Sequence, residues 1–386
     1  MNLRKGITHT LSAALVAGCL GSTSVSAETL RYALGYPPGS DSAKAAEHYA
    51  DMVKEYSNGE LNVRVYPLSL LNFAETSAGL RDGITDIGYL LSPYFPAEYP
   101  HTNLLAEAAM QTQLLDESVQ GKEGPAYVGA LLEYIFFHCD GCNNEFKAQN
   151  QVFTGMASSS NYMLNCNTPV TSVADLRGKR LRAAGSQWSR WATGFGATPV
   201  TLSGNDAMEA LSQGVVDCVL ISAPDLENLG IIEATTNITT DMPGGVFAGA
   251  PIANTNMDTW RRLSDDQRRA MLQASAHISA EIPFVYHARE ADVLERASSE
   301  MGIKLHKAEP DLVNATREFV RGDMTVIAQY YKDRHGVQNG VEMLEEFRPI
   351  LEKWVGLVQD VDSKEALAEV YWTEVLSKVD PSKHGL

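Results

Sequence analysis

The chain has 386 residues, with 48 Asp and Glu against 31 Lys and Arg, so its formal net charge at pH 7 is −17. A protein this acidic is poorly suited to bind nucleic acid or an anionic lipid surface, and we expect no nucleic-acid partner. Its length exceeds the roughly 100–150 residues of a common domain, which predicts two lobes.

The first 27 residues have the pattern of a signal peptide for export. Arg4 and Lys5 precede an apolar run near residues 11–20, and small residues up to Ala27 form a cleavage site. We predict cleavage near Ala27 and a periplasmic mature protein, since no later stretch approaches the ~20 continuous apolar residues of a membrane-spanning helix. A lipoprotein-like box ends at Cys19, so lipid attachment there is the alternative.

Strands and helices alternate after the signal peptide. The elements expected first are a strand over residues 29–34, a helix over 42–56, a strand over 61–66, a helix over about 73–82 and a strand over 86–90. Residues 104–137 are also expected to be largely helical, with a break at 123–125. The first five elements form a β-α-β-α-β unit.

A second β-α-β-α-β unit spans residues 173–225. Its expected strands cover residues 180–184, 197–202 and 215–221, and glycines end the helices between them. Two such units predict two doubly wound α/β lobes with a cleft between them.

Arg182 stands near the carboxyl end of the first strand in this second unit. Ligands of such sheets bind beyond the carboxyl ends of the strands, beside helix N-termini. A guanidinium group there suits a bound carboxylate. Position alone leaves open that Arg182 only pairs with an acidic side chain at the surface.

Residues 264–301 predict one unusually long helix, which starts with the capping box Ser264 to Gln267. Three amphipathic helices are expected after it, over residues 311–334, 341–355 and 364–376.

Four cysteines follow the signal peptide. Cys139 and Cys142 form a C-x-x-C motif, and a local disulfide is favoured over redox chemistry because the motif follows a helical segment in an exported chain. No second C-x-x-C or paired histidine completes a zinc site. Cys166 and Cys218 lie at strand edges, where they either pair or are simply buried.

Residues 172–217 also carry a long ordered motif. It consists of Ser172, Asp175 to Gly178, Arg180 to Arg182, Trp191, Gly196-Ala197, Pro199-Val200 and Ala210 to Asp217. This motif resembles that of the solute-binding subunits of TRAP transporters, the DctP-type periplasmic proteins, and the resemblance extends over about residues 30–305. It implies a periplasmic-binding-protein-like α/β fold with a long helix that spans both lobes. It also implies a salt bridge from Arg182 to the carboxylate of the substrate, and TRAP membrane subunits as partners.

The resemblance divides the chain into lobes. The expected divisions are a first lobe of residues 28–150 plus about 245–280, a second lobe of 151–244 plus about 281–305, and a helical extension of 306–386. We expect the extension to pack on the second lobe.

Further ligand-binding residues are implied by their positions in the family pattern. These candidates are Asn161, Trp188, Ser222, Glu75, Tyr89, Ser92, Phe247 and Ser40, with Tyr94 as another wall residue. Many relatives have a second arginine that falls here on or near Asn161, and a Q-E-N segment that is replaced here by residues 219–221.

Both departures remove polar or charged groups from the expected pocket. Trp188, Trp191 and Phe247 are expected near it from their positions in the family pattern. We therefore expect a monocarboxylate with an apolar or aromatic body, held by one arginine. A sulfonate would satisfy much of the same geometry.

Other classes of function have weaker support. The sequence has no G-x-S-x-G, no metal-ligand cluster and no phosphate loop, so we expect neither an enzyme nor a bound metal or cofactor. A ligand-sensing receptor for a signalling partner is one alternative. A thiol-redox protein that uses Cys139 and Cys142 is another.

Overall fold

The computed structural model describes residues 27–115 and 119–386. The predicted signal peptide, including Cys19, lies outside the described residues except for Ala27. Among the helices within those ranges, none combines the length and the apolar character that a membrane span requires.

The first lobe is built on a sheet with strand order β2-β1-β3-β10-β4. Its strands are β1 (Glu28–Leu34), β2 (Leu61–Pro67), β3 (Ile87–Gly88), β4 (Gln151–Val152) and β10 (Asn254–Asn256). Strand β1 runs parallel to β2 and β3, whereas β10 is antiparallel to both of its neighbours. The accompanying helices are α1 (Asp41–Tyr56), α2 (Thr76–Arg81) and α10 (Met257–Arg262). The order predicted for the first five elements is therefore confirmed, with α2 and β3 shorter than predicted.

The second lobe is built on a sheet with strand order β11-β9-β5-β8-β6-β7. Its strands are β5 (Tyr162–Cys166), β6 (Arg180–Ala183), β7 (Thr198–Thr201), β8 (Cys218–Ser222), β9 (Asn237–Thr240) and β11 (Lys304–Lys307). Its helical segments are α6 (Val173–Leu176), α7 (Ser186–Gly194), η4 (Gly204–Asp206), α8 (Ala207–Ser212), α9 (Ala223–Asn228) and η5 (Ile231–Ala234). Strand β6 is parallel to β7 and β8, as expected of a doubly wound unit.

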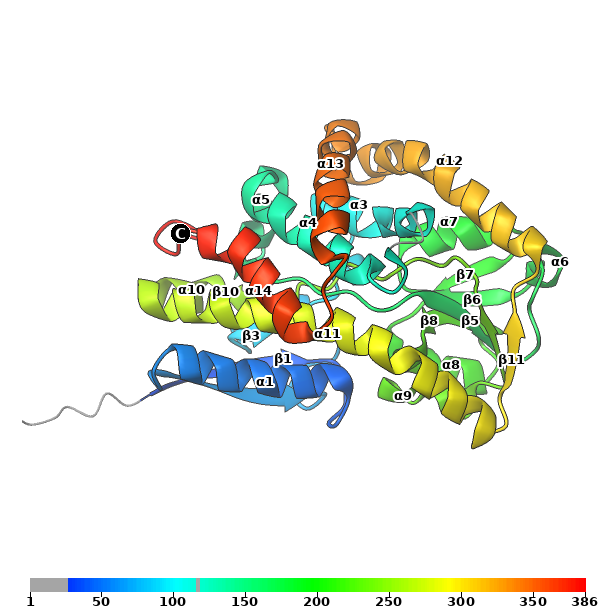
Figure 1. The fold of residues 1–386 in the computed structure, drawn as a ribbon, viewed down its shortest axis with the longest axis horizontal. Helices are drawn as coiled ribbons and strands as arrows, with labels where there is room; N and C mark the ends of the chain where they lie inside the picture. The colour runs from blue at the N-terminus through cyan, green and yellow to red at the C-terminus, as the bar shows by residue number, and fades with distance from the viewer. Residues whose placement is uncertain (1–26, 116–118) are drawn as a thin grey trace, which may run out of the picture.

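Helix α11 (Asp265–Ser299) is a single helix of 35 residues that runs along both lobes, shown in yellow in Figure 1. Ser264 accepts from the backbone N–H of Gln267, and the side chain of Gln267 accepts from the backbone N–H of Ser264, so the predicted capping box is present. Its N-terminal half packs against α1 and its C-terminal part lies beside α9. The predicted lobe-spanning helix is confirmed.

The remaining helices come from two parts of the chain. Those from the first half are η1 (Ser92–Tyr94), α3 (Pro100–Glu107), η2 (Ala108–Leu114), α4 (Glu123–Phe137) and α5 (Asp140–Ala148), and those from the end of the chain are α12 (Pro310–His335), α13 (Gly340–Val358), α14 (Lys364–Glu374) and η6 (Leu376–Lys378).

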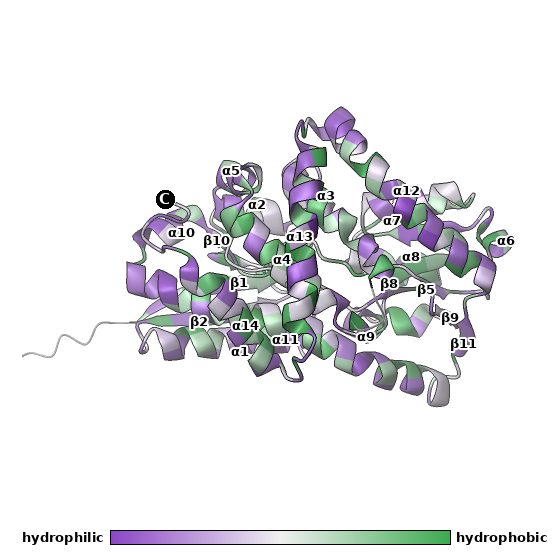
Figure 2. Ribbon diagram, turned by 45° about the horizontal axis from the view of Figure 1, so that its top comes forward, coloured by the Kyte–Doolittle hydropathy of each residue, from purple (hydrophilic) through white to green (hydrophobic). Residues whose placement is uncertain are grey.

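In the C-terminal extension, α12 packs on the second lobe, against α6 and α7. Helix α13 packs on α4, and α14 packs on α11 and α4. The physical reason is that α4 is apolar almost all round and needs cover on several sides, and α13 turns its buried Phe347 and Trp354 towards it. Figure 2 shows hydrophobic residues in green where α4 and α13 meet, and hydrophilic residues in purple on the outer face of α12. The end of the chain reaches the first lobe, where Trp260 donates to the carbonyl of His384 at 2.8 Å.

Both cysteine pairs form disulfides. Cys139 caps the N-terminus of α5 and bonds to Cys142, and both residues are buried. Cys166 and Cys218 stand directly opposite each other on antiparallel strands β5 and β8 and are also bonded. The sequence left open whether Cys166 and Cys218 pair or are simply buried, and the structure shows them paired.

Candidate functional site

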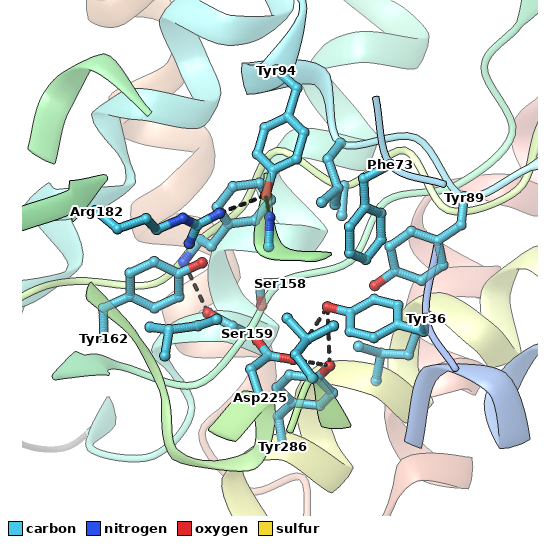
Figure 3. Close-up of a pocket in the computed structure, with 17 residues that line it drawn as sticks. Tyr36, Phe73, Tyr89, Tyr94, Ser158, Ser159, Tyr162, Arg182, Asp225 and Tyr286 are labelled. Atoms are coloured by element: carbon cyan, nitrogen blue, oxygen red, sulfur yellow. Dashed lines mark hydrogen bonds between the residues drawn. The ribbon is translucent and has the colours of Figure 1, made fainter. Parts of the chain in front are cut away.

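A pocket lies between the two lobes, beyond the carboxyl ends of β1, β6 and β8 and against α11 (Figure 3). The pocket is lined by Tyr36, Phe73, Tyr89, Leu91, Tyr94, Ser158, Ser159, Tyr162, Arg182, Gly204, Ile221, Asp225, Leu229, Phe247, Ala250, Ile282 and Tyr286. Because these residues come from both lobes, the pocket is assembled only when the lobes approach each other.

Arg182 supplies the cation of this pocket, and its side chain is 1% exposed. Its Nε donates to the carbonyl of Leu202 at 3.1 Å, and its Nη2 donates to the hydroxyl of Tyr94 at 2.6 Å. Its Nη1 is buried and has no hydrogen-bond partner among the described residues. An unpaired buried N–H of a charged group costs several kcal/mol in general, so the site is poised to accept an anion.

Aromatic side chains form most of the remaining wall. The ring of Tyr36 meets the rings of Phe73 and Tyr89 edge to face, at centroid distances of 4.9 and 5.4 Å. Elsewhere in the wall, the rings of Tyr162 and Phe247 stack at 6.2 Å. The pocket therefore offers apolar ring faces around a single arginine.

Asp225 forms a second polar group of the pocket, in the first turn of α9. One oxygen accepts from the hydroxyls of Tyr286 and Tyr36 at 2.8 and 3.2 Å, and the other accepts from Ser222 at 2.9 Å. Burial raises the pKa of Asp225 to about 6, although these hydrogen bonds oppose the rise. Burial, with the charge of Asp225, also raises the pKa values of Tyr36 and Tyr286 well above their ordinary range.

Direct hydrogen bonds join the lobes at the rim of the pocket. The hydroxyl of Tyr94 accepts from the backbone N–H of Gly204 at 2.9 Å, and Asn205 donates to the carbonyl of Gly35 at 2.8 Å. Farther out, the amide of Asn228 accepts from the backbone N–H of Asp41 at 3.0 Å. These contacts describe a closed arrangement of the two lobes.

The predicted site residues fall into three groups. Arg182, Tyr89, Phe247 and Tyr94 line the pocket. Trp188, Ser222 and Ser92 are fully buried but lie behind the wall. Asn161, Glu75 and Ser40 lie away from the pocket, because each has a different local role.

The buried group supports the wall from behind. Trp188 stacks on Tyr162 at 4.4 Å and donates to the carbonyl of Gly244 at 2.8 Å, so it supports a lining residue from behind. Ser222 is occupied by Asp225, and Ser92 donates to the carbonyl of Gly249 at 3.3 Å. In this arrangement all three residues lie behind the lining residues, and their contact with a ligand stays a prediction.

The third group makes local contacts outside the pocket. The side chain of Asn161 accepts from Gln113 at 2.6 Å in a separate depression. The carboxylate of the exposed Glu75 accepts from the backbone N–H of Asn72 at 3.0 Å. Ser40 caps α1, accepting from the backbone N–H of Ala43 at 3.2 Å.

Sequence reasoning missed several lining residues, above all Tyr36, Tyr162, Asp225 and Tyr286. Tyr162 is the neighbour of the predicted Asn161, and side chains alternate between the two faces of a strand, so an error of one residue selects the wrong face. Tyr36 stands in the loop directly after the first predicted strand, which was a signal that could have found it. Among the described residues, no group of three His, Cys, Asp or Glu is arranged to hold a metal ion.

The raised pKa of Asp225 predicts a pH-dependent contribution to stability. Because the folded state binds this proton more tightly than the unfolded state, its stabilising effect is complete below about pH 4 and is lost as the pH rises to about 6. Two pKa units correspond to about 3 kcal/mol. We therefore expect the free energy of unfolding of Asp225→Asn, relative to wild type, to rise by up to about 3 kcal/mol between pH 4 and pH 7, as measured by urea denaturation.

Asp217→Asn is the control with the opposite sign. Its hydrogen bonds from Arg180 lower the pKa of Asp217, so this variant should lose stability relative to wild type as the pH rises. Identical pH profiles for Asp225→Asn and wild type would refute the assignment of the raised pKa.

The chain matches the family described as bacterial extracellular solute-binding protein, family 7 (DctP), over residues 139–330. A curated relative is the outer membrane transporter protein TsaT of Comamonas testosteroni, which is 24% identical over 304 residues that cover 78% of this chain and 84% of the relative.

Solved structures share the fold. One is a TRAP solute binding protein from Rhodoferax ferrireducens in complex with benzoate, with a TM-score of 0.72, 19% identity, and coverage of 86% of this chain and 99% of that chain. Another is a TRAP solute binding protein from a marine metagenome, specific for aromatic acid ligands and solved with 3-hydroxybenzoate, with a TM-score of 0.71, 20% identity, and coverage of 85% of this chain and 99% of that chain. The two-lobe α/β fold predicted from the sequence is confirmed.

Proposed function

We propose that this chain, which matches family 7 of the bacterial extracellular solute-binding proteins, the DctP family, over residues 139–330, is the periplasmic solute receptor of a TRAP transporter. It binds a small organic carboxylate between its lobes and delivers it to the membrane subunits of a sodium-coupled transporter. The periplasmic location is supported by the signal-peptide pattern of residues 1–27.

The observation that carries this proposal is the unpaired Nη1 of Arg182. The group is charged, buried and adjacent to the pocket, and the described residues leave it without an acceptor. A carboxylate of the ligand supplies that acceptor through a charge-assisted hydrogen bond, which contributes about 1.5–3 kcal/mol net. A sulfonate presents the same acceptor atoms.

The walls favour a ligand with a flat apolar body. Seven aromatic rings line the pocket, from Tyr36, Phe73, Tyr89, Tyr94, Tyr162, Phe247 and Tyr286. The proteins solved with benzoate and 3-hydroxybenzoate both hold aromatic monocarboxylates, and this chemistry suits one arginine among ring faces. We propose aromatic monocarboxylates as the substrate class.

A thermal-shift screen of the mature chain, residues 28–386, tests the proposal. The panel contains benzoates, phenylacetates, aliphatic diacids, sugar acids and benzenesulfonate. A ligand present at 1,000 times its dissociation constant stabilises the folded state by about 4 kcal/mol, so a micromolar binder is easily seen at millimolar concentration. We expect aromatic monocarboxylates to raise the melting temperature most. Stabilisation by uncharged compounds alone would refute the proposal.

Tyr94→Phe is expected to weaken ligand binding by about tenfold. The hydroxyl of Tyr94 accepts from both Arg182 and Gly204, so it positions the guanidinium and joins the lobes. Losing an acceptor of two buried donors costs about 1–3 kcal/mol, and tenfold corresponds to 1.4 kcal/mol. Titration calorimetry measures the change. Tyr66→Phe, on β2 and away from the pocket, is the matched control and should bind as wild type.

A further inference from the structure

The pocket has a second polar group that capture of a carboxylate does not use. Asp225 is 4% exposed and lines the same pocket as Arg182. In Figure 3 the two side chains lie on different sides of the pocket, with Arg182 beside Tyr94 and Asp225 between Tyr36 and Tyr286. A ligand held by Arg182 at one end therefore extends towards Asp225 with the other.

Within the described part of the chain, the side chain of Asp225 is held only by neutral groups. Three hydroxyls, from Tyr36, Tyr286 and Ser222, donate to its two oxygens. No ion pair joins it to a basic residue among the residues that the structure describes. Arg289, one turn beyond Tyr286 on α11, pairs instead with Asp41 and Glu227.

An ionised carboxylate has about four acceptor positions, so three donors leave one unfilled. A negative charge in a pocket that binds anions does not add general attraction for the ligand. It discriminates among ligands, because a donor on the ligand fills the last position whereas a second acid is repelled at close range. An apolar end leaves the position empty without repulsion.

We propose that Asp225 is a specificity-determining residue, which selects carboxylates that carry a hydrogen-bond donor, a hydroxyl or an amino N–H, at the end remote from the carboxylate. The inference rests on the proposed function, since Arg182 determines which end of the ligand reaches Asp225. Sites built to hydrogen-bond a substrate hydroxyl discriminate strongly against the analogue that lacks it, because a buried polar group is then left unpaired.

Titration calorimetry on the mature chain, with a matched series of ligands, tests this inference. The parents are benzoate and phenylacetate, and each is compared with its hydroxy, amino, methoxy and carboxy derivatives at every ring position. We expect the best hydroxy or amino derivative to bind at least tenfold more tightly than its parent, and the methoxy derivative at that position to lose the gain. The carboxy derivative should bind at least tenfold more weakly than the parent. A comparison of the hydroxy with the amino derivatives identifies whether the site prefers a hydroxyl or an amino N–H as the donor.

Asp225→Asn should reduce the penalty for the carboxy derivative by at least tenfold, because it removes the charge and preserves the shape. Asp225→Ala, which removes the acceptor altogether, should abolish the preference for donors and serves as the second variant if Asp225→Asn does not fold. Asp217→Asn, in the same lobe and paired with Arg180 at the surface, should leave every ratio unchanged.

Equal affinity of the wild type for parent, hydroxy, amino and carboxy compounds would overturn this inference and leave the proposed function intact. The same ratios in Asp225→Ala as in wild type would also overturn it. If no aromatic carboxylate binds the wild type, the proposed substrate class falls, and this inference falls with it.

Discussion

Arg182→Ala is expected to raise the dissociation constant for the carboxylate ligand by about 10²–10³-fold. Truncating one partner of a buried, hydrogen-bonded charge pair costs about 2–5 kcal/mol, and each 1.4 kcal/mol is tenfold in affinity. The guanidinium is 1% exposed, so little water remains to replace it as a partner of the ligand. Titration calorimetry with the tightest ligand of the thermal-shift panel measures the change.

Arg180→Ala is the matched control for this variant. Arg180 lies two residues earlier on the same strand, but its side chain is exposed and pairs with Asp217 at 2.8 Å. We expect wild-type affinity from Arg180→Ala and a melting temperature for ligand-free Arg182→Ala close to that of wild type. Wild-type affinity in Arg182→Ala would show that the ligand is held elsewhere.

Removing the Cys166–Cys218 disulfide is expected to lower the free energy of unfolding by about 4 kcal/mol. The bond closes a loop across a sequence separation of 52 residues, and cross-linking a loop of that length removes a large entropy from the unfolded chain. It also fixes β5 to β8 in the middle of the second sheet. The variant is Cys166→Ala combined with Cys218→Ala, measured by urea denaturation.

The second disulfide provides an internal comparison. Cys139 and Cys142 are separated by only 3 residues, so the same entropy argument gives about 2 kcal/mol for the double alanine variant. All four cysteines are buried, so the packing losses of the two double variants are similar. Equal losses from the two pairs would contradict the loop-entropy explanation.

Local patterns in the sequence predicted those parts of the fold that local physics determines. The capping box at Ser264 and the apolar strand before Ser222 depend on neighbouring residues, so the long helix and the order of the second sheet were foreseeable. Arg182 was foreseeable for the same reason, since it stands at the end of a strand just before a glycine turn and a helix.

The rest of the pocket depends on how distant segments meet. Tyr36, Asp225 and Tyr286 are far apart in the sequence but share hydrogen bonds, and nothing local distinguishes Tyr286 from the core residues of its helix. Trp188 illustrates the same point, because this large aromatic at the start of α7 faces the core while its stacking partners Tyr162 and Phe247 line the pocket. The placement of α13 and α14 likewise follows from the unusually apolar α4, which the sequence did not connect with them.

The most direct test of carboxylate capture by Arg182 is a calorimetric comparison of one ligand in two forms. The tightest aromatic carboxylate of the panel and its primary amide have nearly the same shape, but only the acid offers a negatively charged acceptor to the free Nη1. We predict that the wild type binds the acid at least 100-fold more tightly than the amide and that Arg182→Ala loses this preference. Equal affinity of the wild type for acid and amide would contradict the role of Arg182 as the anion-binding group of this receptor.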